Sequence, residues 1–189
     1  MTAALPLRLT TAPFWARLAA VAGGAGVMAL ASQAAIPMQP VPLTLQTLAL
    51  FVLAAVLGGS LTLRAVLIWL TAAALGAPVL ADGEGGAAAL FGPAQGYLFG
   101  MAVAGALAGH AAARRQDVAG LFAIFLVGHA VVLAVGWLGL LERLPPREAF
   151  VAGVLPFLPG AALKSLAAAG LVRLVALALA RHAALRADA

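Results

Sequence analysis

The segment from Leu121 to Leu141, LFAIFLVGHAVVLAVGWLGLL, is apolar and contains no charged residue. It exceeds the ~20 residues that a helix needs to cross the hydrocarbon core of a bilayer. The whole 189-residue chain has this character: 65% of its residues are hydrophobic and 9% are charged, whereas soluble domains contain about 25% charged residues. The sequence therefore predicts an all-α integral membrane protein that folds with lipid as its solvent.

Five further apolar stretches predict a six-transmembrane-helix bundle that forms a single domain over residues 1–189. Prolines and glycines separate the stretches, notably between Ile36 and Leu43 and between Gly76 and Pro93. A removable signal peptide is an alternative for the first stretch, because Ala29-Leu30-Ala31 resembles a cleavage site, but its length favours a retained helix. The expected spans are 14–36, 43–57, 65–80, 97–113, 121–141 and 161–180.

Basic residues indicate how these spans are oriented. Six spans with the amino terminus inside leave only Arg143 and Arg147 among the arginines at the outer face. Cytoplasmic loops carry an excess of Lys and Arg, so this distribution predicts that both termini are cytoplasmic. The net charge of +5 then reflects cytoplasmic loops and anionic lipid, and we expect no nucleic-acid partner. The arginines assigned to the cytoplasmic face are Arg8, Arg17, Arg64, Arg114, Arg115, Arg173, Arg181 and Arg186.

Lys164 is the only lysine and lies in an apolar stretch just after Pro159-Gly160. A charge at mid-membrane costs roughly 2.5 to 3.5 kcal/mol, so such a residue suggests a functional site. The ammonium group and the free N–H groups of a helix that begins near Pro159 could together bind an organic anion. The alternative is that the long side chain reaches the outer headgroups and binds nothing.

Other polar or aromatic residues could complete a site, although each has a simpler explanation. Asp82 lies in a glycine-rich loop that could approach a ligand or be only a flexible connection. Tyr97, the only tyrosine, could offer its ring and hydroxyl to a ligand or anchor a helix at the interface. Thr44, Gln46 and Thr47 begin the second helix, where they could bind a ligand or join helices.

Small residues at four-residue spacing, Ala16 and Ala20, could dock a partner membrane protein or pack the first helix inside the bundle. Several functions are excluded by missing motifs. The chain has no cysteine, no G-x-x-x-x-G-K-[ST] phosphate loop and no catalytic constellation. His110 and His129 have no metal-site spacing, so we expect structural roles for them and no metal. We therefore expect no enzyme, and uphill transport would need another subunit or an ion gradient.

A series of motifs resembles the BioY family, the biotin-binding S components of energy-coupling factor (ECF) importers, over roughly Gln33 to Ala169. The resemblance implies biotin held near the outer face of a multi-pass protein in a prokaryotic cytoplasmic membrane. It also implies a transmembrane coupling (T) subunit and cytoplasmic ABC-type ATPases as partners. The motifs are Gln33, Ile36-Pro37, Val41-Pro42-Leu43-Thr44-Leu45-Gln46-Thr47-Leu48, Gly76-Ala77-Pro78-Val79, Gly85-Gly86, Gly92-Pro93, Gly96-Tyr97-Leu98, and Pro156-Phe157-Leu158-Pro159-Gly160 with Lys164.

The resemblance also implies site residues. The family's polar contacts map onto Lys164 and Asp82, and onto Tyr97 and Gln46, while Phe91 can supply part of an apolar wall for biotin. The chain departs from the family at Ala161, where BioY proteins usually have Asp, and at Ala94-Gln95, where they usually have Thr-Gly. Two alternatives remain open: an S component for another small vitamin, and a stand-alone secondary transporter.

Overall fold

The computed structural model describes residues 12–115 and 117–187. Arg8 lies outside the described residues, and so does the side chain of Arg186. The described chain is mostly helical, with one two-stranded ribbon. In chain order the elements are α1 (Phe14–Gln33), β1 (Ala35–Ile36), β2 (Leu43–Thr44), α2 (Gln46–Leu57), α3 (Gly59–Ala74), the 3-10 helix η2 (Ala81–Gly83), α4 (Ala87–Leu90), α5 (Gln95–Ala112), α6 (Val118–Leu140), α7 (Pro146–Gly153), the 3-10 helix η3 (Leu155–Phe157) and α8 (Leu158–Ala187).

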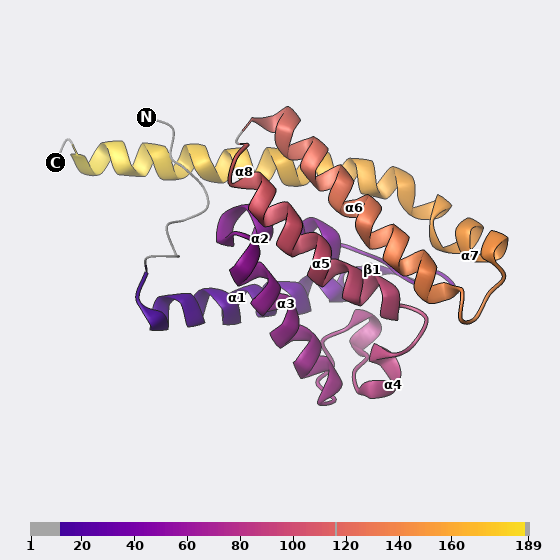
Figure 1. The fold of residues 1–189 in the computed structure, drawn as a ribbon. Helices are drawn as coiled ribbons and strands as arrows, with labels where there is room; N and C mark the ends of the chain where they lie inside the picture. Colours follow the sequence, from indigo (N-terminus) through magenta and orange to yellow (C-terminus); the bar gives the residue numbers. More distant parts are fainter. Residues whose placement is uncertain (1–11, 116, 188–189) are drawn as a thin grey trace.

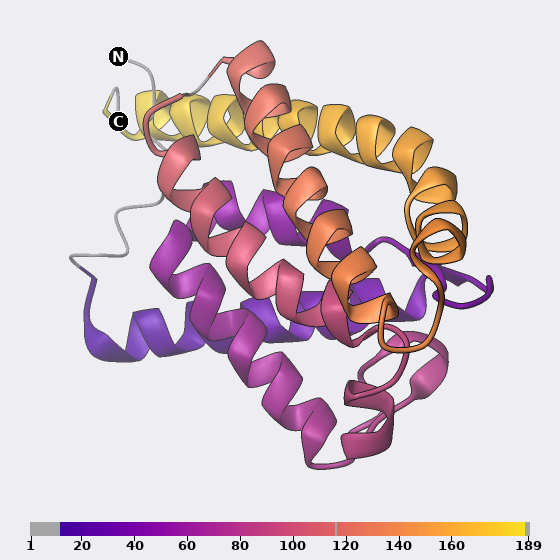
Figure 2. The same cartoon turned by 45° about the vertical axis from the view of Figure 1, so that its right-hand side comes forward.

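The long helices run between two ends of the molecule (Figures 1 and 2). At one end α1 begins, α2 turns into α3, α5 gives way to α6, and α8 ends; we call this the turn end. At the other end lie the β1–β2 ribbon, η2, α4 and α7, and we call this the cavity end. The cavity end holds most of the irregular backbone, including residues 37–42, 75–80 and 141–145, whereas the single residue Gly58 links α2 to α3 at the turn end.

Close helix packing at the centre depends on glycine. A Cβ atom at Gly96 of α5 would meet the backbone oxygen of Val135 in α6, and one at Gly100 would lie 3.2 Å from the Cα of Val132. Small residues allow helix backbones to approach closely in membrane proteins. Larger side chains fill the remaining interior, where the rings of Phe51 and Phe125 stack with centroids 5.3 Å apart.

The exterior is rich in apolar side chains, as expected of a surface that faces lipid. Leu30, Leu163 and Val127 are 74%, 69% and 65% exposed. Three helical stretches, Phe14–Gln33, Val118–Leu140 and Pro146–Arg181, are long and apolar enough to cross a bilayer, while α2 and α3 are shorter apolar helices. The fold is that of a membrane protein.

Several helix ends differ from the expected spans. The first helix ends at Gln33, because Ala35–Ile36 leaves the helix and pairs with Leu43–Thr44 in an antiparallel ribbon. Between the second and third helices, only Gly58, with a positive φ of 80°, forms the turn, and Arg64 lies inside α3. The last helix begins at Leu158, because Pro159 is tolerated in a first helical turn where its missing N–H is not needed.

Candidate ligand-binding site

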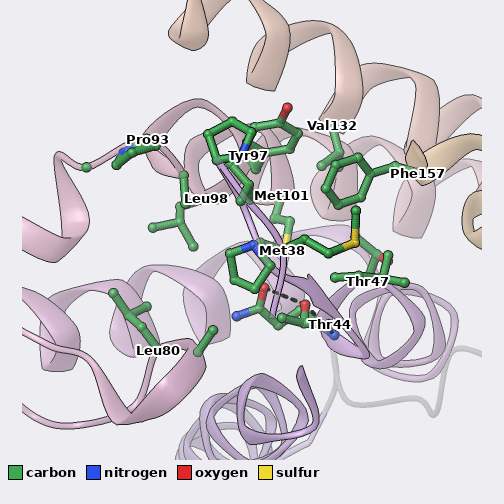
Figure 3. Close-up of a pocket in the computed structure, with 18 of the residues that line it drawn as sticks. Met38, Thr44, Thr47, Leu80, Pro93, Tyr97, Leu98, Met101, Val132 and Phe157 are labelled. Atoms are coloured by element: carbon green, nitrogen blue, oxygen red, sulfur yellow. Dashed lines mark hydrogen bonds between the residues drawn. The ribbon is translucent and has the colours of Figure 1, made fainter. Parts of the chain in front are cut away.

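A cavity of about 640 Å³ lies at the cavity end. Its wall is formed by the segment 37–44, the start of α2, the η2–α4 region, and one face each of α5, α6 and α8. Ligand-binding cavities typically measure about 300 to 1,000 Å³. Figure 3 shows Leu80 and Pro93 on one side of this space and Phe157 and Thr47 on the other. The cavity is therefore large enough to enclose a small organic molecule.

Lys164 contributes the cavity's cationic group from the second turn of α8. Its Nζ donates a hydrogen bond to the backbone oxygen of Thr44 at 3.1 Å. Among residues 12–115 and 117–187, no carboxylate lies within ion-pair distance of this Nζ. An ammonium group has three N–H donors, so one bond to a carbonyl leaves donors for a ligand. The side chain points toward the cavity and its charge is not neutralised by a described residue.

Thr44 and Gln46 line the same cavity and are bonded to each other. The Thr44 hydroxyl donates to Gln46 Oε1 at 2.9 Å, and Gln46 Nε2 donates to the buried Ser32 hydroxyl at 2.8 Å. These bonds join the ribbon and α2 to the end of α1. Gln46 is buried with both ends of its amide engaged, so its side chain is held in one orientation beside the cavity.

A second polar network lies where α2, α6 and α8 meet. His129 Nε2 is 3.0 Å from the Thr47 hydroxyl, and its Nδ1 is 2.9 Å from the Ser165 hydroxyl. Thr47 and His129 both line the cavity. His129 is buried and has partners on both ring nitrogens, so it joins three helices beneath the site.

Tyr97 lines the cavity through its ring. Its hydroxyl donates to the backbone oxygen of Gly153 at 2.6 Å, and Figure 3 shows the hydroxyl pointing away from the centre of the cavity. The ring centroid of Phe157 lies 5.9 Å from that of Tyr97. Tyr97 therefore supplies an aromatic surface to the cavity, while its hydroxyl links α5 to α7 by a hydrogen bond.

Asp82 and Glu84 bring acidic groups to the rim of the cavity, and both are exposed. Asp82 has a φ of 57°, which Asp tolerates better than most residues, and this conformation forms the tight turn of η2. The backbone of Gly85 packs so closely against Ala77 that a Cβ atom there would meet the Ala77 oxygen. Glycine is thus required to fold this rim back against the end of α3.

Two groups of expected site residues lie elsewhere. Phe91 is 56% exposed and does not line the cavity, because it caps the short helix α4 with its ring against Phe99 on the outside of α5. Ala16 and Ala20 are half-buried on α1, and Ala20 packs against the cluster of Val21 and Leu61. The exposed small residues of α1 include Ala19, Ala22, Gly23 and Gly26.

The structure also places residues in the cavity wall that the sequence analysis did not select. They include His129 among polar residues and Met38, Leu80, Met101 and Phe157 among apolar ones. Thr47, which the sequence offered as a candidate together with Thr44 and Gln46, also lines the cavity. No local signal identifies Met38, because its place depends on how the proline-rich segment folds over the helices.

The arrangement suits an amphipathic organic acid. An unpaired ammonium group can meet a carboxylate, oriented hydroxyl and amide groups can meet a polar head, and the apolar wall can cover a ring or an alkyl chain. No group of three or more metal-ligating side chains occurs in the part of the chain that the structure describes. The site has the features of a binding pocket.

Sequence comparison relates the chain to one family. The model described as the BioY family matches residues 3–181. "Biotin transporter BioY2" of Lactococcus lactis subsp. cremoris is 36% identical over 143 residues, which cover 74% of this chain and 79% of that protein. "Probable biotin transporter BioY" of Pyrococcus horikoshii is 34% identical over 127 residues, which cover 67% and 75% of the respective chains.

Structural comparison agrees with the sequence comparison. A crystal structure described as the S-component for biotin from an ECF-type ABC transporter superposes on this chain with a TM-score of 0.76 and 26% sequence identity. The superposition covers 85% of this chain and 90% of the other. The similarity therefore extends over most of the fold.

Proposed function

This chain belongs to the BioY family, and from that premise we propose that it binds biotin and takes it up as the substrate-specific membrane subunit of an ATP-driven importer. The observation that carries the proposal is the position of Lys164. It is the only lysine of the chain, and its Nζ lies in a membrane-protein cavity without a carboxylate partner among the described residues.

Biotin matches the chemistry of this cavity. Its carboxylate requires a cation, which Lys164 supplies, and its ureido ring requires donors and acceptors, which Thr44, Gln46 and Asp82 supply. Its thiophane ring and valeryl chain require an apolar wall, and Tyr97 lies in that wall with Met101 and Phe157. We do not include Phe91, because its exposed ring is outside the cavity.

Ala161 gives this member of the family a distinct cavity. Ala161 is buried in the cavity wall, three residues before Lys164. BioY proteins usually have Asp there, so the usual local partner of the lysine is missing. A carboxylate at this position would compete with the ligand for the ammonium group. Its absence favours a direct bond between Lys164 and the carboxylate of biotin.

The topology that accompanies this function is six membrane spans with both termini in the cytoplasm. The spans are α1, α2, α3, α5, α6 and the last helix. Arginines are more frequent at the turn end and acidic residues at the cavity end, although Arg143 and Arg147 also lie at the cavity end. Arg17, Arg114 and Arg181 belong to the turn end, while Asp82 and Glu148 belong to the cavity end. The excess of basic residues at cytoplasmic faces assigns the turn end to the cytoplasm and the cavity to the outer face.

The same proposal includes partners. A coupling (T) subunit and cytoplasmic ABC-type ATPases supply the energy of transport, because this chain contains no phosphate-binding loop. We place the docking surface for the coupling subunit on α1, where Ala16 and Ala20 border an exposed face that includes Ala22 and Gly26. Such a face allows close helix approach.

The decisive experiment is equilibrium binding of radiolabelled biotin to the purified chain in detergent, with a panel of other vitamins as competitors. We expect saturable binding that unlabelled biotin displaces and the other vitamins do not. Preferential displacement by another vitamin would identify an S component with a different substrate. Biotin flux into vesicles that contain this chain alone, driven by an ion gradient, would instead support a stand-alone secondary transporter.

A further inference from the structure

A second cavity, distinct from the biotin site, lies between α1 and α3 and begins at the turn end. Its volume is about 320 Å³. Four of its residues, Phe14, Arg17, Leu18 and Val21, share one face of α1 by their three- and four-residue spacing. The others are Leu61, Arg64, Leu67 and Ile68 of α3. Nearer the middle of α1, the two helices approach closely, and a Cβ atom at Gly24 would lie 3.0 Å from that of Ala65. The groove opens beside this crossing.

The two arginines of the groove lack acidic partners. Neither forms an ion pair with any residue that the structure describes. The Nε of Arg17 is buried and has no hydrogen-bond acceptor within the described chain. A buried donor without an acceptor costs free energy, so such a group in a native structure calls for an explanation. An oxygen atom of a bound ligand would satisfy it.

The rest of the groove is apolar and open to the membrane. Phe14 and Leu18 are 73% and 53% exposed, and Leu67 and Ile68 of α3 are also exposed. Trp15, two residues before Arg17 in the first turn of α1, is exposed as well, and tryptophan is enriched at membrane interfaces. The groove thus combines cationic donors at the depth of the headgroups with an apolar wall that faces the hydrocarbon.

We propose that the groove between α1 and α3 binds an anionic phospholipid of the cytoplasmic leaflet, with its phosphodiester on Arg17 and Arg64 and an acyl chain along Leu18 and Ile68. Guanidinium groups bind phosphate oxygens through two parallel N–H donors. Basic pockets between membrane helices on the cytoplasmic side suit anionic headgroups. A free phosphate ion would meet the arginines but leave the apolar wall uncovered, so the lipid fits the whole groove better.

The test is native mass spectrometry of the purified full-length protein with dioleoyl phosphatidylglycerol or dioleoyl phosphatidylcholine added at matched concentrations. We expect one tightly bound phosphatidylglycerol and a clear preference over phosphatidylcholine. The double variant Arg17→Gln/Arg64→Gln should lose affinity for phosphatidylglycerol by about fivefold for each arginine, because a basic residue near the surface contributes about this factor. The matched control, Arg114→Gln/Arg115→Gln, changes two arginines outside the groove and should retain the bound lipid.

Biotin binding of each variant reports on folding and should stay unchanged, because neither arginine lines the biotin cavity. If the double variant does not fold, the single change Arg64→Gln at an exposed residue still predicts about a fivefold loss. Equal binding of the two lipids, or equal losses in the two double variants, would overturn the proposal. Displacement of the lipid by millimolar inorganic phosphate would identify an anion site only. Unchanged lipid binding together with lost co-purification of the coupling subunit would show that the arginines serve a protein contact.

Discussion

Lys164 illustrates how one residue depends on two distant parts of the chain. Its Nζ is fixed by the carbonyl of Thr44, which is 120 residues away in sequence. Burying a charged group in a membrane protein is unfavourable unless it is paired or useful. Since no described carboxylate pairs with it, we expect Lys164 to contribute to ligand binding more than to the stability of the fold.

Replacing Lys164 with Ala should weaken biotin binding by about ten- to a hundredfold, because hydrogen bonds to charged groups contribute about 1.5 to 3 kcal/mol. The measurement is the Kd of the purified variant for biotin and for biotin methyl ester, which lacks the carboxylate charge. The wild-type preference for biotin over the ester should disappear in the variant. Arg147→Ala, at an exposed arginine of the same end, is the control. A preference that survives in Lys164→Ala would separate the lysine from the carboxylate.

The ring and the hydroxyl of Tyr97 have different roles. The ring lines the cavity, while the hydroxyl bonds to Gly153. Tyr97→Phe should therefore lower thermal stability, since an unsatisfied buried carbonyl costs about 1 to 3 kcal/mol, but change the biotin Kd by less than about twofold. Thermal unfolding and biotin titration of the same preparation test both parts. A large loss of affinity at unchanged stability would mean that the hydroxyl contacts biotin, as the sequence alone allowed.

At the scale of the helices, glycine determines which backbones can touch. Gly96 at the start of α5 packs directly on the backbone of α6, so a side chain there meets atoms that cannot rotate away. This differs from Gly170 of α8, where a Cβ atom would meet nothing within 4 Å. The same residue type is therefore essential at one site and replaceable at another.

Gly96→Ala should destabilise the protein by about 1 to 3 kcal/mol through overpacking. Gly170→Ala should be neutral or slightly stabilising, because Ala favours helix more than Gly does. Thermal unfolding in detergent compares the two variants under one condition. The packing argument fails if both variants unfold at the same temperature as the wild type.

Helix α1 presents different faces to different neighbours. Val21, Gly24 and Met28 are buried, whereas Ala22 and Gly26 are exposed. Ala22→Trp should reduce co-purification of the coupling subunit by about tenfold or more, since a bulky side chain prevents close helix contact, and should leave the biotin Kd unchanged. Ala167→Trp, at an exposed position of α8, serves as the control. Normal assembly of Ala22→Trp would move the docking surface away from this face.

At the scale of the whole molecule, the two ends differ in charge and in backbone. The turn end has short connections and many arginines, and the cavity end has the ribbon, the short helices and most of the acidic residues. This asymmetry matches a protein that collects its ligand at one membrane face and meets its ATPases at the other. In the proposed topology, the lipid groove and the ligand cavity lie toward opposite leaflets.

The absence of cysteine from the natural sequence allows a clean test of this topology. Single cysteines at Glu148 and at Arg114, both exposed, should respond differently to a membrane-impermeant maleimide applied to intact cells. Glu148→Cys should be labelled at once, and Arg114→Cys only after the membrane is permeabilised. Labelling of both in intact cells, or the reverse order, would contradict six spans with cytoplasmic termini.

Much of the cavity could be anticipated from residue type together with the resemblance to the BioY family. Lys164, Thr44, Gln46, Asp82 and Tyr97 were selected from the sequence and all line the cavity. The sequence could not show that Phe91 lies outside the cavity wall, because a short apolar segment does not reveal whether its phenylalanine is exposed or buried. His129 and Met38 were missed because their neighbours come from other helices and from a folded proline-rich loop.

The sequence by itself determined that the chain is an apolar helical protein, approximately where six of its helices lie, and that one lysine occupies an unfavourable position. These properties follow from composition and from the local rules of proline, glycine and charge. Only the tertiary structure decided which side chains share a cavity and which way Tyr97 turns its hydroxyl. The physical reason is that nearly every face of these helices is apolar, so a face is about equally stable against lipid and against the protein interior. Which helices become neighbours is therefore decided by close packing at glycines far apart in the sequence and by a few long-range hydrogen bonds.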